Sequence, residues 1–524
     1  MQRPLGAQIS HMLKDRGIDV IFGIPGVHNQ EMYRGIEEAG ITHVLARHEQ
    51  GAGFMADGYA RATGKPGVAY VITGPGLCNI MTPMGQAWSD SVPMLVISSC
   101  LDETAAIKGQ LHQMKDQRAA AETVCDWSLE ARTAEAAYVL IDRALVEFRM
   151  QRARPKHIQV PISVLQAPAP PPPPETGVVP RAGAEIRDGL IDPLLTAKRP
   201  LFILGGGAGQ AGDAARDAMK KLGAACFETY AGRGVAASYA LSFGSTLARP
   251  ESQDIIRSAD VVVLVGTELA ETDLWRADSG LAGMTLQVDI DPSGLHPKTD
   301  RAVIARASEY FDRLLGAIEG HVPVAEWDEA GVRAATRRWK AQVAAERPGI
   351  VPVADALRKC LPDLTMIYSD MTQFAYAAKE VWPMEHSGFW HHPTGFGTLG
   401  YALPAAIGGA IARPDLPTMA IIGDYGFHYT MQELGVAVEL GLSLPVILWD
   451  NGRLGEIEDS MVRAQIAPNA VVAHNPDFCK LAEAFGARAV APQTLNGFQS
   501  AVRAAFKATG PTLIYLTPEI SKRR

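Results

Sequence analysis

The chain has 524 residues, of which 47% are hydrophobic, and its length predicts three or four domains with buried cores. It carries 49 basic and 57 acidic residues, a formal net charge of −8, which argues against nucleic acid or an anionic membrane surface as a partner.

The amino-terminal sequence and the spacing of the cysteines indicate in which cellular compartment the protein is expected. Residues 1–17 lack the apolar core of a signal peptide, and no segment approaches the roughly 18 apolar residues of a membrane span. The six cysteines are scattered, with no CxxC pair or other metal-ligand spacing, so we expect buried thiols in a reducing compartment. A cytoplasmic protein with no membrane partner is therefore expected.

Strands alternate with helical patterns over most of the chain, which predicts the α/β class with parallel sheets. The proline run after residue 166 cannot enter a helix and predicts an extended spacer. The expected organisation is a first α/β domain over 1–166, a Pro-rich linker over 167–183, a central Rossmann-like α/β domain over 184–325, a charged helix and connector over 326–349, and a third α/β domain over 350–524.

Glu49 is the most informative residue of the first domain. It stands beside small and apolar residues, Ala52 to Phe54, which can desolvate a carboxyl group and keep it protonated near neutral pH. The other interpretation is an ordinary glutamate at a helix start, paired with Arg47 or Arg61. The residue alone favours that second interpretation.

The central domain contains a glycine-rich turn. Residues 207–212 read GxGxxG directly after an apolar strand, and Glu228 follows 21 residues after Gly207. This spacing is typical of a dinucleotide-binding fingerprint, although a lone fingerprint is a weak signal. A dinucleotide-binding dehydrogenase, or a nucleotide-sensing subunit without catalysis, is therefore the alternative of another class.

The third domain contains a strand, a helix and a strand that predict a metal-diphosphate site. Residues 418–423 form an apolar strand that delivers Asp424 to a crevice, and residues 445–451 form a second strand ending on Asn451. A carboxylate, an amide oxygen and a nearby backbone carbonyl are hard ligands of the kind that Mg²⁺ takes. The helix that begins after Gly426 offers free N–H groups to phosphate. Asp-Gly turns between strands and helices are common, so the spacing alone leaves the site open.

Four blocks in the same order resemble the thiamine diphosphate-dependent enzymes of the acetolactate synthase and 2-oxo acid decarboxylase superfamily. The blocks are residues 22–26, 46–76, 397–410 and 423–451. The resemblance covers nearly the whole chain. It implies a pyrimidine-binding first domain, a diphosphate-binding third domain, and a homodimer or homotetramer in which Glu49 and Asp424 act from different subunits.

The resemblance also implies the cofactors, thiamine diphosphate and Mg²⁺, and the residues that hold them. Glu49 corresponds to the carboxylate that hydrogen-bonds the aminopyrimidine ring, and Leu399 to an apolar wedge that keeps the two cofactor rings bent. The implied metal ligands are Asp424, Asn451 and the backbone carbonyl of Arg453. The other implied cofactor contacts are Gln373, Gly397, Gly423, Tyr425, Gly426 and Phe427. In the family the metal motif begins Gly-Asp-Gly, whereas Tyr425 stands third here.

Acetolactate synthases hold FAD in the central domain and many relatives hold ADP or nothing, so FAD or ADP is an option here but is not the expectation. Two departures weaken the synthase assignment. Thr272 stands where the synthases carry a substrate-recognising Arg, and Ser460 stands where they carry a Trp.

Acidic residues follow the metal loop. Glu456, Glu458 and Asp459 lie on a probable helix, where Glu456 shares a face with Asp459 or Ser460. A carboxylate facing the reaction centre would pair with a cationic substrate tail, best with a guanidinium. The pattern resembles decarboxylases of 5-guanidino-2-oxopentanoate. Carboxylates that merely cap a helix near Arg463 explain the pattern equally well.

Histidines are the candidates for protonating the product after decarboxylation, because imidazole titrates near neutrality. His112 replaces a Phe of the synthases and Gln113 matches their Gln, which suggests a proton relay. His28 is a weaker option near the active-site mouth, and His391 and His392 are better explained as a solvated loop pair. The resemblance thus implies nonoxidative decarboxylation of a 2-oxo acid to an aldehyde, with an acetolactate synthase-like carboligase as the alternative.

Overall fold

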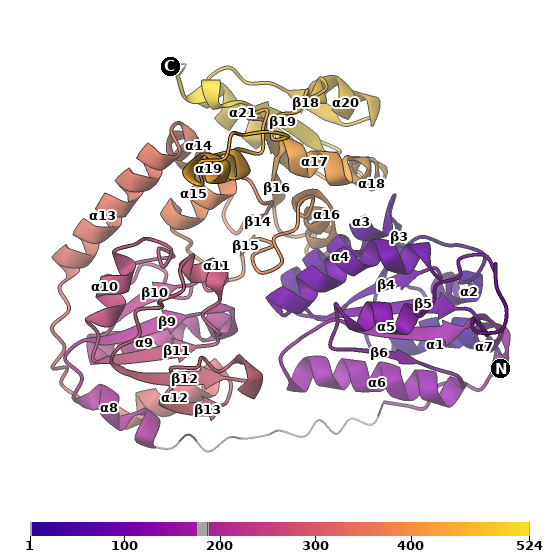
Figure 1. The fold of residues 1–524 in the computed structure, drawn as a ribbon, viewed down its shortest axis with the longest axis horizontal. Helices are drawn as coiled ribbons and strands as arrows, with labels where there is room; N and C mark the ends of the chain where they lie inside the picture. Colours follow the sequence, from indigo (N-terminus) through magenta and orange to yellow (C-terminus); the bar gives the residue numbers. More distant parts are fainter. Residues whose placement is uncertain (1–2, 176–185, 187, 523–524) are drawn as a thin grey trace.

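The computed structural model describes residues 3–175, 186 and 188–522. Three α/β units form three lobes, and the third lies above the other two in Figure 1. Each unit is built on one sheet whose neighbouring strands are all parallel. The prediction of three parallel α/β domains is therefore confirmed. Residues 176–183 of the predicted linker, and the predicted start of the central domain at residue 184, lie outside the described residues.

The first unit has a six-stranded sheet in the order β3-β2-β4-β5-β7-β6. Its central strands are short buried runs with a hydrophobic cluster on each face, as parallel sheets covered by helices require. Its elements are β2 (Val20–Gly23), β3 (Thr42–Leu45), β4 (Gly67–Val71), β5 (Met94–Cys100), β6 (Trp127–Glu130), β7 (Lys156–Pro161), α1 (Leu5–Asp15), α2 (Gln30–Glu38), α3 (Glu49–Thr63), α4 (Pro75–Asp90), α5 (Gln117–Glu122), α6 (Ala134–Met150) and α7 (Ile162–Gln166).

The beginning of the proline-rich segment belongs to this first unit. Strand β8 (Pro168–Ala169) pairs antiparallel with β1 (Arg3–Pro4) at the start of the chain. The Tyr138 hydroxyl also donates to the carbonyl of Pro170 at 2.7 Å. The folded part of the first unit therefore extends beyond residue 166, while the other domain limits stay predictions.

The central unit has a five-stranded sheet in the order β10-β9-β11-β12-β13. Its elements are β9 (Pro200–Leu204), β10 (Ala225–Glu228), β11 (Val261–Val265), β12 (Met284–Asp289), β13 (Arg301–Ile304), α8 (Asp192–Leu195), α9 (Gly212–Leu222), α10 (Ser252–Arg257), α11 (Glu271–Leu274), α12 (Ala307–Ala317), and the 3₁₀ helices η1 (Asp188–Leu190), η2 (Gly206–Ala211) and η3 (Pro292–Gly294).

Most of the predicted connector is one long helix, α13 (Glu329–Glu346), which runs from the central lobe to the third lobe. Its Trp339 packs in the core of the central unit, whereas its Val343 packs in the core of the third unit. The connector is therefore a packed helix that fixes these two units to each other.

The third unit has a six-stranded sheet in the order β15-β14-β16-β17-β19-β18. Its elements are β14 (Met366–Ser369), β15 (Trp390–His391), β16 (Thr418–Gly423), β17 (Pro445–Trp449), β18 (Arg488–Val490), β19 (Thr512–Leu516), α14 (Ile350–Arg358), α15 (Gln373–Val381), α16 (Ala402–Ala412), α17 (Asp424–Thr430), α18 (Leu434–Glu439), α19 (Gly455–Arg463), α20 (Phe478–Ala484), α21 (Leu495–Ala505), η4 (Met431–Glu433) and η5 (Pro518–Lys522).

The first and third units pack through α3 and α16, and small residues bring these helices close. A methyl group at position 58 would collide with the carbonyl of Ala405, and one at position 408 with the carbonyl of Met55. The Tyr368 hydroxyl donates across the interface to the carbonyl of Gly58 at 2.9 Å. One hydrophobic cluster is continuous across the contact, so the helix that begins at Glu49 is anchored on the third unit.

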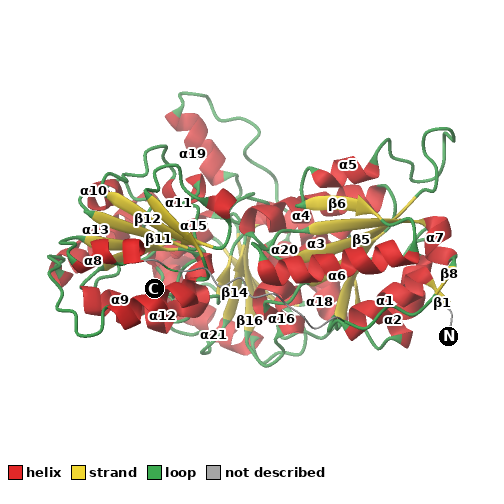
Figure 2. Ribbon diagram, turned by 90° about the horizontal axis from the view of Figure 1, so that it is seen from below, coloured by secondary structure: helices red, strands yellow, loops and turns green. Residues whose placement is uncertain are grey.

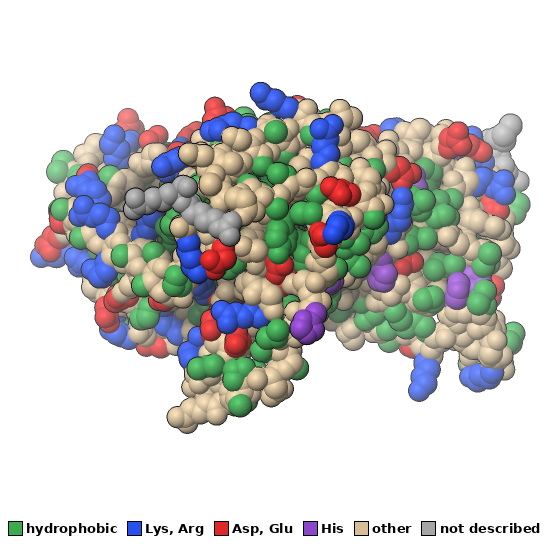
Figure 3. Space-filling model, turned by 90° about the horizontal axis from the view of Figure 1, so that it is seen from above, with side chains coloured by type: hydrophobic (Ala, Val, Ile, Leu, Met, Phe, Trp, Pro, Cys, Tyr) green, Lys and Arg blue, Asp and Glu red, His purple; other side chains and the backbone are tan. Residues whose placement is uncertain are grey.

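The charges on one face of the molecule and the state of the cysteines can be compared with what the composition predicts. On the face drawn in Figure 3, basic and acidic side chains are interspersed rather than gathered into one basic surface. All six cysteines are free thiols. Within the described ranges, no helix has both the length and the apolar character needed to cross a bilayer.

Candidate active site

Asp424 and Asp450 leave the sheet side by side. Strands β16 and β17 are parallel neighbours in which Gly423 pairs with Trp449, so the residue after each strand lies at the same edge. The predicted strand, helix and strand are all present. Burial, together with the neighbouring Asp450 carboxylate, raises the pKa of Asp424 to about 6. Two carboxylates crowded at a buried strand end are suited to a cation.

The predicted magnesium ligands have the chemistry that the ion requires. Asp424 is 3% exposed. The side-chain oxygen of Asn451 accepts from the backbone N–H of Arg453 at 3.3 Å, and its amide nitrogen donates to Gln373 at 3.2 Å. The tight turn from 451 to 453 therefore keeps the amide oxygen and the Arg453 backbone together. A carboxylate, an amide oxygen and a carbonyl are hard oxygen donors, so these residues fit Mg²⁺.

The displaced glycine of the metal motif has a steric reason. A methyl group at position 426 would collide with the carboxylate of Asp370, whereas Tyr425 is half-buried. The Asp370 carboxylate accepts from the backbone N–H of Gly400 at 2.8 Å, and burial raises its pKa to about 7. Asp370 thus joins the turn after Leu399 to the start of α17. The side chain of Phe427 is fully buried, so only its backbone can contact a cofactor.

The loop that carries Gly397 and Leu399 is held from the first unit. The hydroxyl of Thr398 donates to Gln86 on α4 at 2.9 Å. Gly397 has a φ of +67°, in the left-handed region that favours glycine. Leu399 is half-buried, so it is not a full member of the core.

Glu49 begins α3 and is 8% exposed. Its carboxylate accepts from the Asn79 amide at 2.8 Å. Arg47 is instead paired with Glu439, and Arg61 with Asp57 and Asp90. The interpretation of Glu49 as the partner of Arg47 or Arg61 is therefore wrong, and its surroundings are an amide and the turn at Gly76.

His28 and His112 face each other, with ring centroids 4.9 Å apart. Among the described residues, the Nδ1 atom of each ring is buried without a hydrogen-bond partner. Burial, with a smaller effect of His112, lowers the pKa of His28. The backbone of His112 packs against Gly74, and Glu49 against Gly76, so one short turn separates the histidine pair from Glu49.

Gln113, which the sequence analysis grouped with His112 in a proton relay, bonds to its own loop, whereas the His112 ring faces His28. Gln113 donates to the carbonyls of Thr104 and Ile107, at 3.0 and 2.7 Å. These bonds tie the loop between β5 and α5 to itself. The contacts of Gln113 thus shape the loop that presents His112.

Each of the three acidic residues of α19 accepts a hydrogen bond from another side chain. Glu456 accepts from the Arg347 guanidinium at 2.9 Å, Glu458 from Arg453 at 2.7 Å, and Asp459 from Gln373 at 3.3 Å. Ser460 is exposed. Arg463, which the capping interpretation invoked, is not among these partners. Figure 2 shows α19 standing out from the rest of the third unit.

The prediction that His391 and His392 form a solvated loop pair is wrong. His391 ends β15 and both rings are buried. The Nδ1 atom of His392 lies 2.9 Å from the Ser369 hydroxyl. Burial lowers the pKa of His391 to about 3, which makes it a poor proton donor near neutrality.

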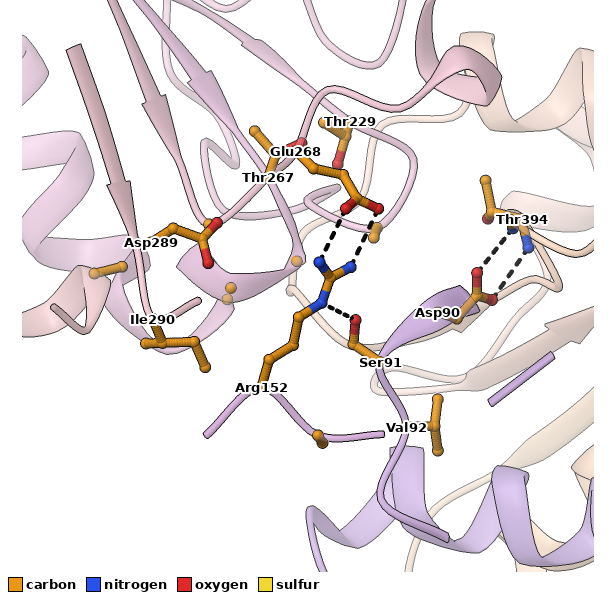
Figure 4. Close-up of a pocket in the computed structure, with 18 of the residues that line it drawn as sticks. Asp90, Ser91, Val92, Arg152, Thr229, Thr267, Glu268, Asp289, Ile290 and Thr394 are labelled. Atoms are coloured by element: carbon orange, nitrogen blue, oxygen red, sulfur yellow. Dashed lines mark hydrogen bonds and ion pairs between the residues drawn. The ribbon is translucent and has the colours of Figure 1, made fainter. Parts of the chain in front are cut away.

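A cavity of about 700 Å³ lies where the three units meet (Figure 4). Arg152 crosses it with a double contact to Glu268, at 2.9 and 3.1 Å. The glycines at 206, 207 and 209 line it. Glu228, the acidic residue of the predicted dinucleotide-binding fingerprint, is buried and accepts from the backbone N–H of Ala236 at 2.8 Å. The glycine turn therefore borders a cavity, but Glu228, the acidic residue of the same fingerprint, is hydrogen-bonded inside the central unit.

The predicted residues gather in two groups. Glu49, His28 and His112 surround the turn at residues 74–76 of the first unit. Asp424, Asn451, Gln373 and Asp459 form the second group in the third unit. Among the described residues, the hydrogen bonds of these side chains all join residues of the same unit.

Asp370 and Arg347 were not predicted. Asp370 directly follows an apolar strand, which is the same signal that identified Asp424. Nothing in the sequence connects Arg347 with Glu456, because 109 residues separate them.

Comparisons with known proteins match nearly the whole chain. Models of thiamine pyrophosphate enzymes match in order: the N-terminal TPP binding domain at residues 3–120, the central domain at 188–314 and the C-terminal TPP binding domain at 370–516. The chain is 41% identical to the probable 2-ketoarginine decarboxylase AruI of Pseudomonas aeruginosa, over 98% of this chain and 93% of that protein.

Acetolactate synthases are more distant. The chain is 28% identical to the isozyme 2 large subunit of Escherichia coli, over 98% of this chain and 95% of that protein. It is 26% identical to the large subunit of Haemophilus influenzae, over 97% of this chain and 93% of that protein. These matches confirm the resemblance drawn from the four sequence blocks.

Proposed function

Because the chain belongs to the thiamine pyrophosphate enzyme family, we propose that it decarboxylates, without oxidation, a 2-oxo acid with a guanidino tail. The product is an aldehyde. The chain is a thiamine diphosphate-dependent enzyme, and Mg²⁺ is the metal proposed at Asp424, Asn451 and the Arg453 carbonyl. The relative named a 2-ketoarginine decarboxylase supports this substrate class.

The observation that carries the substrate proposal is the guanidinium on Glu456. Arg347 donates to this carboxylate at 2.9 Å. The neighbouring Gly455 packs against the side chain of Gln373, which in turn accepts from Asn451. Glu456, whose carboxylate binds a guanidinium, therefore directly follows a residue that packs against Gln373, one of the proposed cofactor contacts. A substrate guanidinium is the ligand such a carboxylate suits best.

The residues of the chain have distinct tasks in the reaction. When bound, thiamine diphosphate supplies the nucleophilic carbon and the electron sink for loss of carbon dioxide. Glu49, held by Asn79, would hydrogen-bond the aminopyrimidine ring of the bound cofactor, and Leu399 would support the cofactor from below its two rings as an apolar wedge. The buried surroundings of Glu49 would keep water away from this carboxylate.

Proton delivery is assigned to the histidine pair. The Nδ1 atoms of His28 and His112 are buried and have no hydrogen-bond partner among the described residues, so each can accept a hydrogen-bonding ligand. A substrate placed beside the turn at residues 74–76 would satisfy them. Gln113 holds the loop that presents His112.

The assembly proposed is a homodimer or homotetramer in which Glu49 of one subunit meets Asp424 of another, and it is supported by the absence, among the described residues, of a hydrogen bond joining the two groups within one chain. The six free thiols support a reducing compartment, and we place the enzyme in the cytoplasm. FAD or ADP has no part in this proposal, since Glu228 is engaged inside the central unit.

The test is removal and return of the cofactors, followed by a substrate panel. Dialysis against a chelator should abolish activity, and only Mg²⁺ together with thiamine diphosphate should restore it. The restored enzyme should release carbon dioxide and 4-guanidinobutanal from 5-guanidino-2-oxopentanoate faster than it consumes pyruvate. Rapid formation of acetolactate from pyruvate would favour the carboligase instead. A reaction that depends on a nicotinamide nucleotide would favour the dehydrogenase.

A further inference from the structure

Asn475 bridges the two carboxylates at the proposed metal site. Its amide nitrogen donates to Asp424 at 2.8 Å and to Asp450 at 2.9 Å. Asp450 also accepts from the Tyr515 hydroxyl at 2.8 Å. A single amide therefore stands between two acids that repel each other at the buried ends of β16 and β17.

His428 fixes the orientation of this amide. Its Nε2 atom lies 3.2 Å from the side-chain oxygen of Asn475. An amide whose oxygen receives an N–H from the ring must turn its nitrogen toward the carboxylates. The direction of the Asn475 bridge is thus determined by groups on both sides of it.

The bridge also closes a loop. Residues 464–477 connect α19, which bears Glu456, to α20. The loop is tied at its middle by the N–H of Leu454, which donates to the carbonyl of Val471 at 2.8 Å. Asn475 ties its far end to the metal carboxylates. One side chain thus connects the metal site with the segment that follows the proposed substrate-binding helix.

We propose that Asn475 is a positioning residue for the magnesium site. By donating to Asp424 and Asp450 together, it holds the Asp424 carboxylate in the place where it meets the ion, and it fixes the loop at residues 464–477. Partners of this kind around a metal ligand typically change metal affinity about 10- to 100-fold when removed. The inference rests on the proposed function, because that function supplies the metal site.

The experiment measures metal binding rather than turnover. Free Mn²⁺ is followed by electron paramagnetic resonance in titrations of the full-length protein with thiamine diphosphate present. We expect Asn475→Ala to weaken Mn²⁺ binding about 10- to 100-fold. Trypsin should also cleave after Arg463 faster in this variant with Mn²⁺ bound, because the loop has lost its tie. Asn469→Ala, on the same loop but exposed, is the matched control and should bind and resist trypsin like the wild type.

The outcomes separate the two proposals. If the wild type itself binds no Mn²⁺, the proposed metal site fails. If the wild type binds Mn²⁺ and Asn475→Ala binds it equally well, the role of Asn475 is overturned. Should Asn475→Ala not fold, His428→Phe removes the contact that orients the amide. It should then weaken Mn²⁺ binding in the same direction, and unchanged binding would count against the inference.

Discussion

The guanidinium of Arg347, the residue directly after α13, donates to the carboxylate of Glu456 in the first turn of α19 at 2.9 Å. The chain thus places one of its own guanidinium groups where the proposed substrate would place its tail. The Arg347 guanidinium also lies over the ring of Tyr376, 5.9 Å from its centroid, which adds a cation–π interaction to the ion pair with Glu456. A substrate tail can therefore reach Glu456 by sharing the carboxylate with Arg347 or by displacing it.

Glu456→Gln should raise the KM for 5-guanidino-2-oxopentanoate about 10- to 100-fold, because a hydrogen bond to a charged partner is worth about 1.5–3 kcal/mol. The KM for a neutral 2-oxo acid should change little. Glu483→Gln, on an exposed face of α20 in the same unit, is the control. Steady-state kinetics on both substrates measure these KM values. An equal rise of the KM for the neutral acid would exclude charge pairing between Glu456 and the substrate tail.

Glu49→Gln should lower kcat about 10²- to 10⁴-fold, the range for loss of a general acid–base group. The amide keeps the shape of the side chain beside Asn79, so thiamine diphosphate should still bind, as followed by circular dichroism of the loaded protein. Glu37→Gln, at an exposed position of α2, should retain full activity. Near-normal turnover by Glu49→Gln would remove this residue from the reaction.

The sequence predicted those site residues whose signal is local. Asp424 and Asn451 follow apolar runs, so strand ends that meet at one edge of a parallel sheet were sufficient to place them. The sequence shows the displaced glycine at position 426 but not its cause, because the carboxylate that requires it, Asp370, comes from the end of a different strand.

Long-range partners were out of reach. Arg347 meets Glu456 only because α13 packs across two units, and no spacing in the sequence encodes that contact. His391 and His392 were misplaced for a related reason. Two imidazoles before a proline are typical of an exposed loop, yet His391 forms the edge strand β15 and is covered by the meeting of three units.

Gly408→Ala should destabilise the contact between the first and third units, because the new methyl group would collide with the carbonyl of Met55. Overpacking of this kind costs about 1–3 kcal/mol, so the Tm should fall. Gly316→Ala is the matched control in α12, where no atom lies within 4 Å of the new methyl group. Alanine favours a helix by about 0.5–1 kcal/mol relative to glycine, so this control should keep or raise the Tm. A Tm for Gly408→Ala equal to that of the control would show that α3 and α16 tolerate a wider separation.

Acid should destabilise the first unit through His157. Its ring is fully buried, with Nε2 2.8 Å from the Ser98 hydroxyl and Nδ1 2.7 Å from the Ser128 hydroxyl. Burial lowers the pKa of His157 from 6.5 to about 3. Between these values the unfolded chain binds a proton that the folded chain does not. The stabilising contribution is therefore complete above pH 6.5, shrinks as the pH falls, and is gone below about pH 3.

The slope expected from this one ring is about 1.4 kcal/mol per pH unit. His157→Gln keeps hydrogen-bonding atoms between the two serines but does not titrate. In denaturant titrations between pH 6 and pH 4.5, this variant should lose stability less steeply than the wild type. His321→Gln, at the half-buried end of the turn after α12, should keep the wild-type slope. An unchanged slope in His157→Gln would mean that the ring is protonated without unfolding, and that the two serine hydroxyls turn to accept from it.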